Sequence, residues 1–116
     1  MVQNIFVELV ESPIFTSVIT KCVGDDDYRR FQSELVAKPD SGDLVPNSGG
    51  LRKARMNLAG AGKRGGGRVI YLYLRHANTI YLLLAYRKSK RDNLTQNQLK
   101  QLRDLAGQIK AVNRGE

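Results

Sequence analysis

The sequence has 116 residues, a formal net charge of +8 and a pI near 9.9, which predicts one domain at residues 1–116 that attracts a polyanion. Its single cysteine (Cys22) and single histidine (His76) exclude an internal disulfide and a zinc site built from cysteine and histidine. The apolar runs at 69–74 and 80–86 are too short for a membrane span of ~18 residues, and the N-terminus lacks a basic signal-peptide start, so we expect a cytoplasmic protein without a membrane partner.

The first third of the chain predicts a strand and two helices. Residues 5–10 are apolar on both faces and predict a strand in the interior of a sheet. Ser12 and Pro13 form a helix start signal, and Gly24 separates this helix from a second one that Pro39 ends. The apolar side chains expected to pack from the two helices are Ile14, Phe15, Val18, Ile19, Cys22, Tyr28, Phe31, Leu35 and Val36.

The rest of the chain predicts a loop at 39–50, a short strand at 51–56, a hairpin of two strands at 68–75 and 79–87, and a final helix. Thr95 and Gln98 form a capping box for that helix, which ends before Gly115. Its apolar stripe comprises Leu99, Leu102, Leu105, Ile109 and Val112. The order strand, helix, helix, strand, strand, strand, helix predicts an α+β domain with helices packed on a four-stranded, mainly antiparallel sheet.

Positive charge is concentrated in the middle of the chain. Between Leu51 and Arg91 there are eleven lysines and arginines and no acid. An acid-free window of this length indicates a nucleic acid partner. The basic residues of the window are Arg52, Lys53, Arg55, Lys63, Arg64, Arg68, Arg75, Arg87, Lys88, Lys90 and Arg91.

The hairpin allows some of these cations to be placed in space. A turn centred near residues 77 and 78 predicts that Arg68 lies opposite Arg87, at the end of the sheet that also receives Lys63 and Arg64. Alternation along the strand at 51–56 sends Lys53 and Arg55 to one face and Arg52 to the other. The expected result is a cationic bowl with Tyr86 on its rim.

Such a bowl suits phosphate chemistry on RNA. Arginine binds phosphate through two parallel hydrogen bonds, and tyrosine stacks on a base. The 2′-OH of RNA attacks the neighbouring phosphate without a metal, arginine stabilises the developing charge, and a lysine in the cluster is a candidate general base. Because the basic window contains no carboxylate, we expect no metal and no cofactor. The string GAGKRG at 60–65 matches a dinucleotide-binding motif, but a strand rather than a helix follows it.

Two segments resemble the RelE/HigB-type toxins of bacterial toxin–antitoxin modules, most closely the HigB-like members. They read GKRGGGRVIYL at 62–72 and YRKSKRDNLTQNQLKQL at 86–102. The resemblance implies a RelE/ParE-like fold and an endoribonuclease (mRNA interferase) that cuts mRNA in the ribosomal A site, in contact with ribosomal RNA. It also implies a cognate HigA-like antitoxin with a helix-turn-helix domain.

Carried over by residue, Arg68 matches the phosphate-contacting arginine that opens the third strand of the family. Lys53 and Arg55 match basic positions on the second strand, and Lys88 matches the one after the fourth. The tyrosine or histidine that the family places near the position of Leu94 is missing. The expected catalytic residues are Arg68, Lys53, Lys88 and Tyr86, and the expected RNA-binding residues are Arg52, Arg55, Lys63, Arg64, Arg87, Lys90 and Arg91.

Two alternatives remain open from the sequence. A ParE-like relative of the same fold acts on gyrase rather than RNA, and fold alone does not separate the two activities. A plain RNA- or ribosome-binding module binds without cutting, and the near absence of histidine and of carboxylates in the basic window favours that interpretation.

Overall fold

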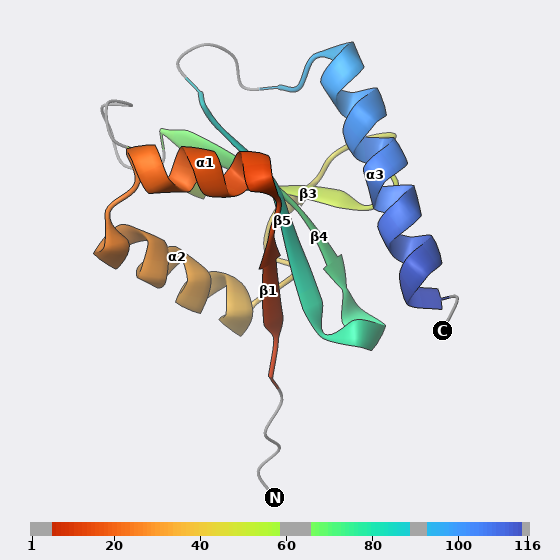
Figure 1. Ribbon diagram of the computed structural model, residues 1–116, viewed down its shortest axis with the longest axis horizontal. Helices are drawn as coiled ribbons and strands as arrows, with labels where there is room; N and C mark the ends of the chain where they lie inside the picture. The colour runs from red at the N-terminus through yellow and green to blue at the C-terminus, as the bar shows by residue number, and fades with distance from the viewer. Residues whose placement is uncertain (1–5, 59–65, 89–92, 115–116) are drawn as a thin grey trace, which may run out of the picture.

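The computed structural model describes residues 6–58, 66–88 and 93–114. Figure 1 shows a central sheet with α1 and α2 together on one side and α3 on the other. This is the α+β class that the sequence predicts. In chain order the elements are β1 (Glu8–Glu11), α1 (Pro13–Cys22), α2 (Asp25–Ala37), β2 (Asp43–Leu44), β3 (Leu51–Met56), β4 (Gly67–Leu74), the 3-10 turn η1 (Arg75–Ala77), β5 (Thr79–Arg87) and α3 (Gln96–Arg114).

The sheet has five strands in the order β1-β5-β4-β3-β2, rather than the four that the sequence predicts. The additional strand, β2, pairs antiparallel with β3 inside the predicted loop at 39–50. It comprises only two residues, which are too few to show an alternating pattern.

The first strand also differs from its prediction, because it lies at the edge of the sheet and not in its interior. β1 pairs only with β5, in parallel, and the pairs of β5 with β4 and of β4 with β3 are antiparallel. Val7 and Leu9 of this segment pack on the core, whereas Val10 is exposed. The continuous apolar run therefore does not indicate burial on both faces.

One face of the sheet packs against α1 and α2. Phe15, Ile19, Phe31 and Leu35 are buried there with side chains of the sheet such as Tyr71. The start of α1 is fixed by Ser12, whose Oγ accepts a hydrogen bond from the Phe15 amide at 3.0 Å and donates one to the Leu83 carbonyl of β5 at 2.8 Å. The predicted cap is confirmed, but Ile14 in the first turn is 63% exposed and does not pack on the sheet.

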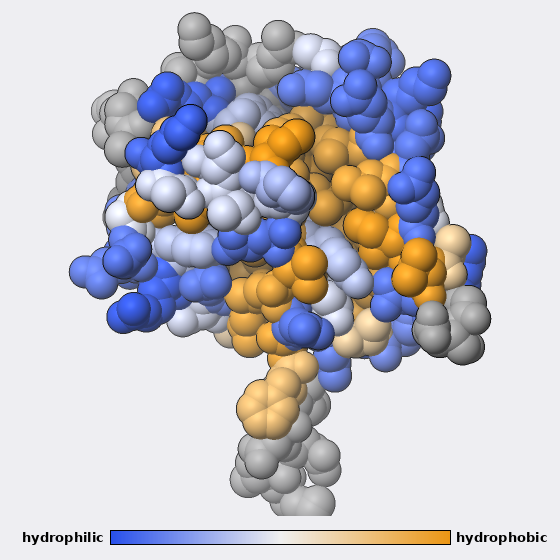
Figure 2. All heavy atoms as spheres, viewed as in Figure 1, coloured by the Kyte–Doolittle hydropathy of each residue, from blue (hydrophilic) through white to orange (hydrophobic). Residues whose placement is uncertain are grey.

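Among the described helices, α3 is the one that packs against the opposite face. Its buried residues are Leu51, Ile70, Leu72, Leu74, Leu83 and, from the helix, only Ala106. Leu102, Leu105 and Ile109 are partly buried against this core, whereas Val112, near the C-terminal end of the helix, is 66% exposed. Figure 2 shows hydrophobic side chains gathered between α1 and α3.

The start of α3 confirms the predicted capping box. The Thr95 amide donates to Gln98 Oε1 and the Gln98 amide donates to Thr95 Oγ1, each at 3.0 Å. Within the described ranges, no helix is long and apolar enough to cross a membrane.

Candidate functional site

Three neighbouring strands bring a row of polar side chains together on the face that α3 partly covers. Arg55 of β3 pairs with Arg68 of β4, and Arg68 pairs with Tyr86 of β5. Since alternate residues of a strand share a face, Arg68 lies on the same face as Ile70 and Leu72. We call Lys53, Arg55, Arg68 and Tyr86 the basic row.

The register corrects the predicted pairing of Arg68 with Arg87. Arg87 pairs with Gly67 instead, one position further along. Alternation therefore turns the side chain of Arg87 to the face of α1 and α2, while Tyr86 shares the face of Arg68. The tyrosine that was expected on the rim lies directly beside the central arginine.

An irregularity in β5 produces this arrangement. Tyr71 pairs with Leu82, but its neighbour Ile70 pairs with Leu84, so that Leu83 is an extra residue in β5. Without this bulge the register would continue in step and place Ala85 opposite Arg68. The bulge shifts the alternation by one residue and thereby brings Tyr86 into the basic row.

Arg68 is only 5% exposed, which is unusual for an arginine. Its Nη1 donates to the Gly67 carbonyl at 3.0 Å. A Cβ at Gly67 would lie 2.7 Å from both Leu58 Cδ1 and the Met56 carbonyl oxygen, so only glycine fits where β4 begins. Close packing around Gly67 therefore fixes the backbone that carries Arg68.

The basic row is linked to the segment before α3. Lys53 Nζ donates to Asn93 Oδ1 at 3.2 Å, across 40 positions of sequence. Leu94, which follows, packs on the core of the same face. The lysine expected to act in catalysis is thus oriented by a residue that the sequence did not single out. No feature of the sequence around Asn93, which stands two residues before the cap at Thr95, indicates this contact.

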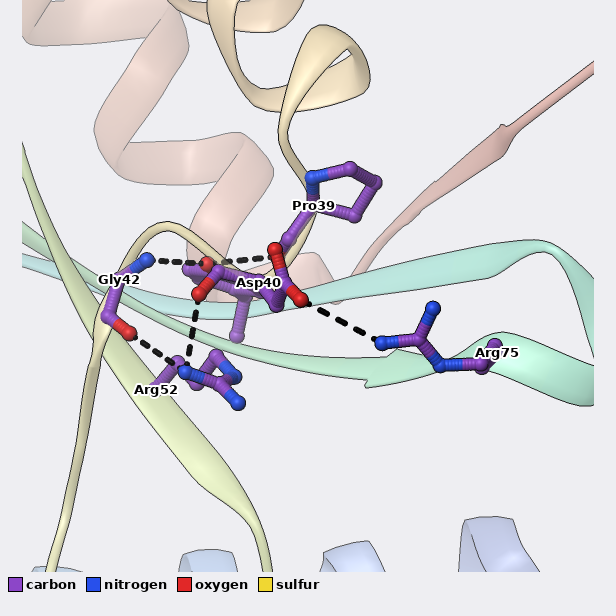
Figure 3. A network of polar contacts seen from close by, with 6 residues as sticks. Pro39, Asp40, Gly42, Arg52 and Arg75 are labelled. Atoms are coloured by element: carbon purple, nitrogen blue, oxygen red, sulfur yellow. Dashed lines mark hydrogen bonds and ion pairs between the residues drawn. The ribbon is translucent and has the colours of Figure 1, made fainter.

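Arg52 belongs to a different structural group on the opposite face, as alternation predicts. Its Nη1 donates to the carbonyls of Asp40 at 3.0 Å and Gly42 at 2.8 Å, while Arg75 forms an ion pair with the Asp40 carboxylate at 3.3 Å (Figure 3). These contacts hold the loop between α2 and β2. The structure therefore separates Arg52 from the row, in a role that stabilises the fold.

Tyr71 completes this network from the buried side. Its hydroxyl donates to the Pro39 carbonyl at 2.8 Å and accepts from the Gly42 amide at 2.9 Å. Burial raises the pKa of Tyr71, so the phenol stays neutral and able to donate. A fully buried aromatic ring thereby fixes the loop that Arg52 fixes from outside.

The other predicted cations are less closely tied to the row. Lys88 is exposed directly after β5, and its backbone amide donates to the Gly66 carbonyl at 2.9 Å. His76 is an exposed turn residue, as expected. Lys63, Arg64, Lys90 and Arg91 lie outside the described residues.

Two hollows, of about 260 and 420 Å³, lie beside α2 along β3, and both include Phe31, Glu34 and Arg55. The first hollow is lined in part by Lys53 and Arg55, so these two members of the basic row border it, whereas Arg68 and Tyr86 line neither hollow. In the part of the chain that the structure describes, no three histidine, cysteine or acidic side chains come together in a group suited to a metal ion.

The side chains of the row have the chemistry that suits an anion. Arginines from two adjacent strands supply planar donors that match phosphate geometry, and Tyr86 offers an aromatic ring beside them. Like charges paired across strands destabilise a sheet, and a bound anion relieves that repulsion. Fold and site together define a small α+β protein with a basic face.

Comparison with known proteins identifies the family. Residues 38–116 match the family model described as the RelE toxin of the RelE/RelB toxin–antitoxin system. The chain belongs to this RelE toxin family, because the match covers more than half of it, and it is therefore a toxin of the toxin–antitoxin class.

Solved structures agree on the fold. The isolated E. coli RelE toxin superposes with a TM-score of 0.54 at 8% sequence identity, covering 86% of this chain and 99% of that one. A double arginine-to-alanine mutant of E. coli RelE in the free state gives a TM-score of 0.54 at 10% identity, covering 73% of this chain and 86% of the other. At such low identity the likeness concerns the fold alone.

Proposed function

We propose that this toxin inhibits translation by cutting mRNA on the ribosome, as a metal-independent endoribonuclease. The observation that carries the proposal is the basic row, in which Arg55, Arg68 and Tyr86 pair across three strands with Lys53 on the same face. A surface that only binds RNA does not need a nearly buried arginine fixed by a tight glycine, whereas transition-state stabilisation requires donors held in place.

The proposed reaction uses the RNA's own 2′-OH. Its oxygen forms a bond to the adjacent phosphorus, its proton passes to a base, and the bond to the 5′ oxygen breaks as that oxygen gains a proton. The products are a 2′,3′-cyclic phosphate and a 5′-OH. Arg68 and Arg55 stabilise the charge on the phosphorane, and the proton-transfer groups come from Lys53, Lys88 and Tyr86.

The proposed partners follow from the family and the HigB-like segments. They are mRNA in the ribosomal A site, ribosomal RNA, and a cognate HigA-like antitoxin that blocks the toxin in the cytoplasm. Asn93 supports the assignment of Lys53, since it holds the ammonium group by a hydrogen bond and Lys53 shares its face of the sheet with Arg68. The family's tyrosine or histidine near position 94 is replaced here by Leu94, and Tyr86 is the aromatic group of the row.

The first test is a cell-free translation reaction on one defined mRNA, with cut sites mapped by primer extension. We expect Arg68→Ala to lower the cleavage rate by ~10²–10³, as for the loss of one transition-state donor. Arg68→Lys keeps the charge but loses the two-pronged geometry, so it is also expected to be strongly impaired. Arg29→Ala removes an exposed arginine from α2, on the other side of the sheet, and serves as the matched control.

Circular dichroism and urea unfolding must show that the Arg68 variants remain folded. Cuts that need ribosomes, persist with Arg29→Ala and disappear with Arg68→Lys would support the proposal. Intact mRNA with folded wild-type protein would reject it. A supercoiling assay and a ribosome-binding assay would then separate gyrase inhibition from passive binding.

A further inference from the structure

A second positively charged surface lies along α3. The helix carries four cations, Lys100, Arg103, Lys110 and Arg114, and only one acid, Asp104. At 3.6 residues per turn, the four cations fall within an arc of about 80° and span about 21 Å of helix length. This arc adjoins the apolar stripe that packs on the sheet and remains on the outside. Figure 2 shows hydrophilic residues along the outer edge of this helix.

We call these four cations the α3 stripe, and contacts with the rest of the molecule show where the stripe lies. Arg103 Nη1 donates to the Asn47 carbonyl at 3.1 Å, and Lys110 Nζ donates to the Gly49 carbonyl. Both carbonyls belong to the segment between β2 and β3. Contacts with neutral carbonyls leave the positive charge uncompensated. Among the described residues, Lys100 and Arg114 are exposed and form no ion pair.

The stripe begins beside the basic row. Asn93 accepts a hydrogen bond from Lys53, and α3 starts three residues later, so Lys100 lies about one turn into the helix. An RNA strand that contacts Lys53 can therefore reach the stripe by following the surface of the chain from Asn93 to Lys100. This continuity favours the same RNA strand, rather than a separate acidic protein, as the occupant.

A glycine inside the stripe is an independent observation. Gly107 lies between Arg103 and Lys110 along the helix and is exposed. A Cβ added at this position would meet nothing within 4 Å, so the packing of the described residues does not require glycine. Glycine in a helix interior is less stable than alanine. It does, however, allow a ligand backbone to approach the helix closely.

We propose that the α3 stripe binds the phosphates of nucleotides flanking the one that occupies the basic row, so that the toxin holds an extended single strand of RNA. This inference rests on the proposed function, because that function places one nucleotide of the same strand at the basic row. It assigns to Lys100, Arg103, Gly107, Lys110 and Arg114 a role in binding rather than in catalysis.

The test compares 2′-O-methyl RNA oligomers, which resist cleavage, of about 4 and about 12 nucleotides. The variant is Lys100→Gln with Arg114→Gln, and the matched control is Lys21→Gln with Arg29→Gln, which removes the same charge from α1 and α2. For the long oligomer, the loss of two phosphate contacts should reduce the magnitude of the slope of log K against log[salt] by about 1.4 in the α3 variant. The control variant should keep the wild-type slope. Affinity for the short oligomer should not change.

Gly107→Ala gives a second test, in which the stability of the protein and its affinity for RNA should change in opposite directions. We expect it to raise the unfolding midpoint of the free protein, because alanine favours the helix. It should also weaken binding of the long oligomer, because the added methyl group keeps the strand away. A folding defect cannot explain that combination.

Equal long-oligomer affinity and salt dependence for the α3 variant and its control would overturn the inference. The inference would also be overturned if polyglutamate bound the wild-type protein as tightly as RNA does and lost affinity to the same extent in the α3 variant. That result would point to an acidic protein partner. Failure of the proposed function is seen separately, as absence of mRNA cuts in the translation assay. The stripe would then stand as an RNA-binding surface of a protein that does not cut.

Discussion

Glu11 at the end of β1 joins three elements through one carboxylate. The hydroxyl of Tyr28 on α2 donates to Glu11 Oε2 at 2.5 Å, and the hydroxyl of Thr16 on α1 donates to Oε1 at 2.5 Å. The ring of Tyr28 also lies 6.1 Å from that of Phe15, centroid to centroid. Burial, reinforced by the negative charge of Glu11, raises the pKa of Tyr28 well above its usual value.

This raised pKa predicts sensitivity to alkaline pH. The folded state holds the Tyr28 proton more tightly than the unfolded state, so its contribution is fully present below the unfolded pKa of about 10 and is lost as pH rises above it. At neutral pH, Tyr28→Phe should cost about 1.5–3 kcal/mol, as expected for a hydrogen bond to a charged group. The difference from wild type, measured by urea unfolding, should shrink above pH 10.

Tyr73→Phe is the control for this prediction. The Tyr73 ring lies 5.6 Å beneath the Arg75 guanidinium, and within the part of the chain that the structure describes its hydroxyl makes no hydrogen bond to a carboxylate. Removal of the Tyr73 hydroxyl should not change how much stability the protein loses at alkaline pH. A difference between wild type and Tyr28→Phe that stays constant from pH 8 to pH 11 would contradict the assigned role of Tyr28.

The residue types in the sequence predicted which side chains form the candidate site better than they predicted the role of each side chain. Arg52 and Arg55 look equivalent in the sequence, yet Arg55 pairs with Arg68 while Arg52 binds the carbonyls of Asp40 and Gly42. Alternation separates their faces, but only the folded loop reveals that Arg52 has partners. Asn93 illustrates the opposite case, because a lone asparagine before a helix cap carries no signal of its contact with Lys53.

At the scale of single elements, the register of the hairpin was predicted incorrectly because the turn, between Leu74 and Thr79, is centred one position earlier than expected, and the bulge at Leu83 offsets half of the resulting shift. The segment TIYLLLAYR is apolar at nearly every position, so that neither alternation nor composition reveals an extra residue. A bulge is a property of pairing between two strands and not of either strand alone. The strands themselves, with boundaries within about one residue, followed from their β-branched and aromatic content.

Among the three α-helices, α3 has the fewest buried residues. Only Ala106 is buried, and leucines of the predicted stripe are only partly covered. Polar contacts add to this attachment, including that between Asn113 Nδ2 and the Tyr81 hydroxyl at 3.2 Å. The close approach of helix and sheet therefore depends on the small side chain at position 106.

Ala106→Leu tests this dependence. The larger side chain has no space against the sheet, and overpacking of this kind typically costs 1–3 kcal/mol. We expect faster hydrogen exchange throughout α3, with little change in the amides of β3, β4 and β5. Ala111→Leu places the same residue on the exposed side of the same helix and should leave exchange unchanged. Equal exchange in the two variants would show that position 106 does not control docking.

At the scale of the whole molecule, the class of fold was predictable from the order of elements and the positions of apolar residues. The sequence did not reveal that the N-terminal strand pairs with β5, about 70 residues away, in parallel. Such a pairing depends on closing a long loop and on the space left beside β5, neither of which has a local signature. The placement of β1 at the edge follows from this topology.

The parallel pairing predicts that the N-terminal part does not fold without β5. A fragment ending at Asn78 retains α1, α2 and β4 but lacks the strand that both α1 and β1 contact. We expect this fragment to show no cooperative urea transition and to be digested rapidly by protease, unlike the full chain. A cooperative transition in the fragment would show that β5 is dispensable for the first core.

The same topology has a consequence for synthesis. During translation the N-terminal strand leaves the ribosome long before its partner exists, and contacts this distant in sequence also slow folding. Lys53, Arg68 and Tyr86 come into register only when β5 has emerged, and Asn93 and α3 follow later still. The basic row of a nascent chain is therefore incomplete until synthesis is nearly finished.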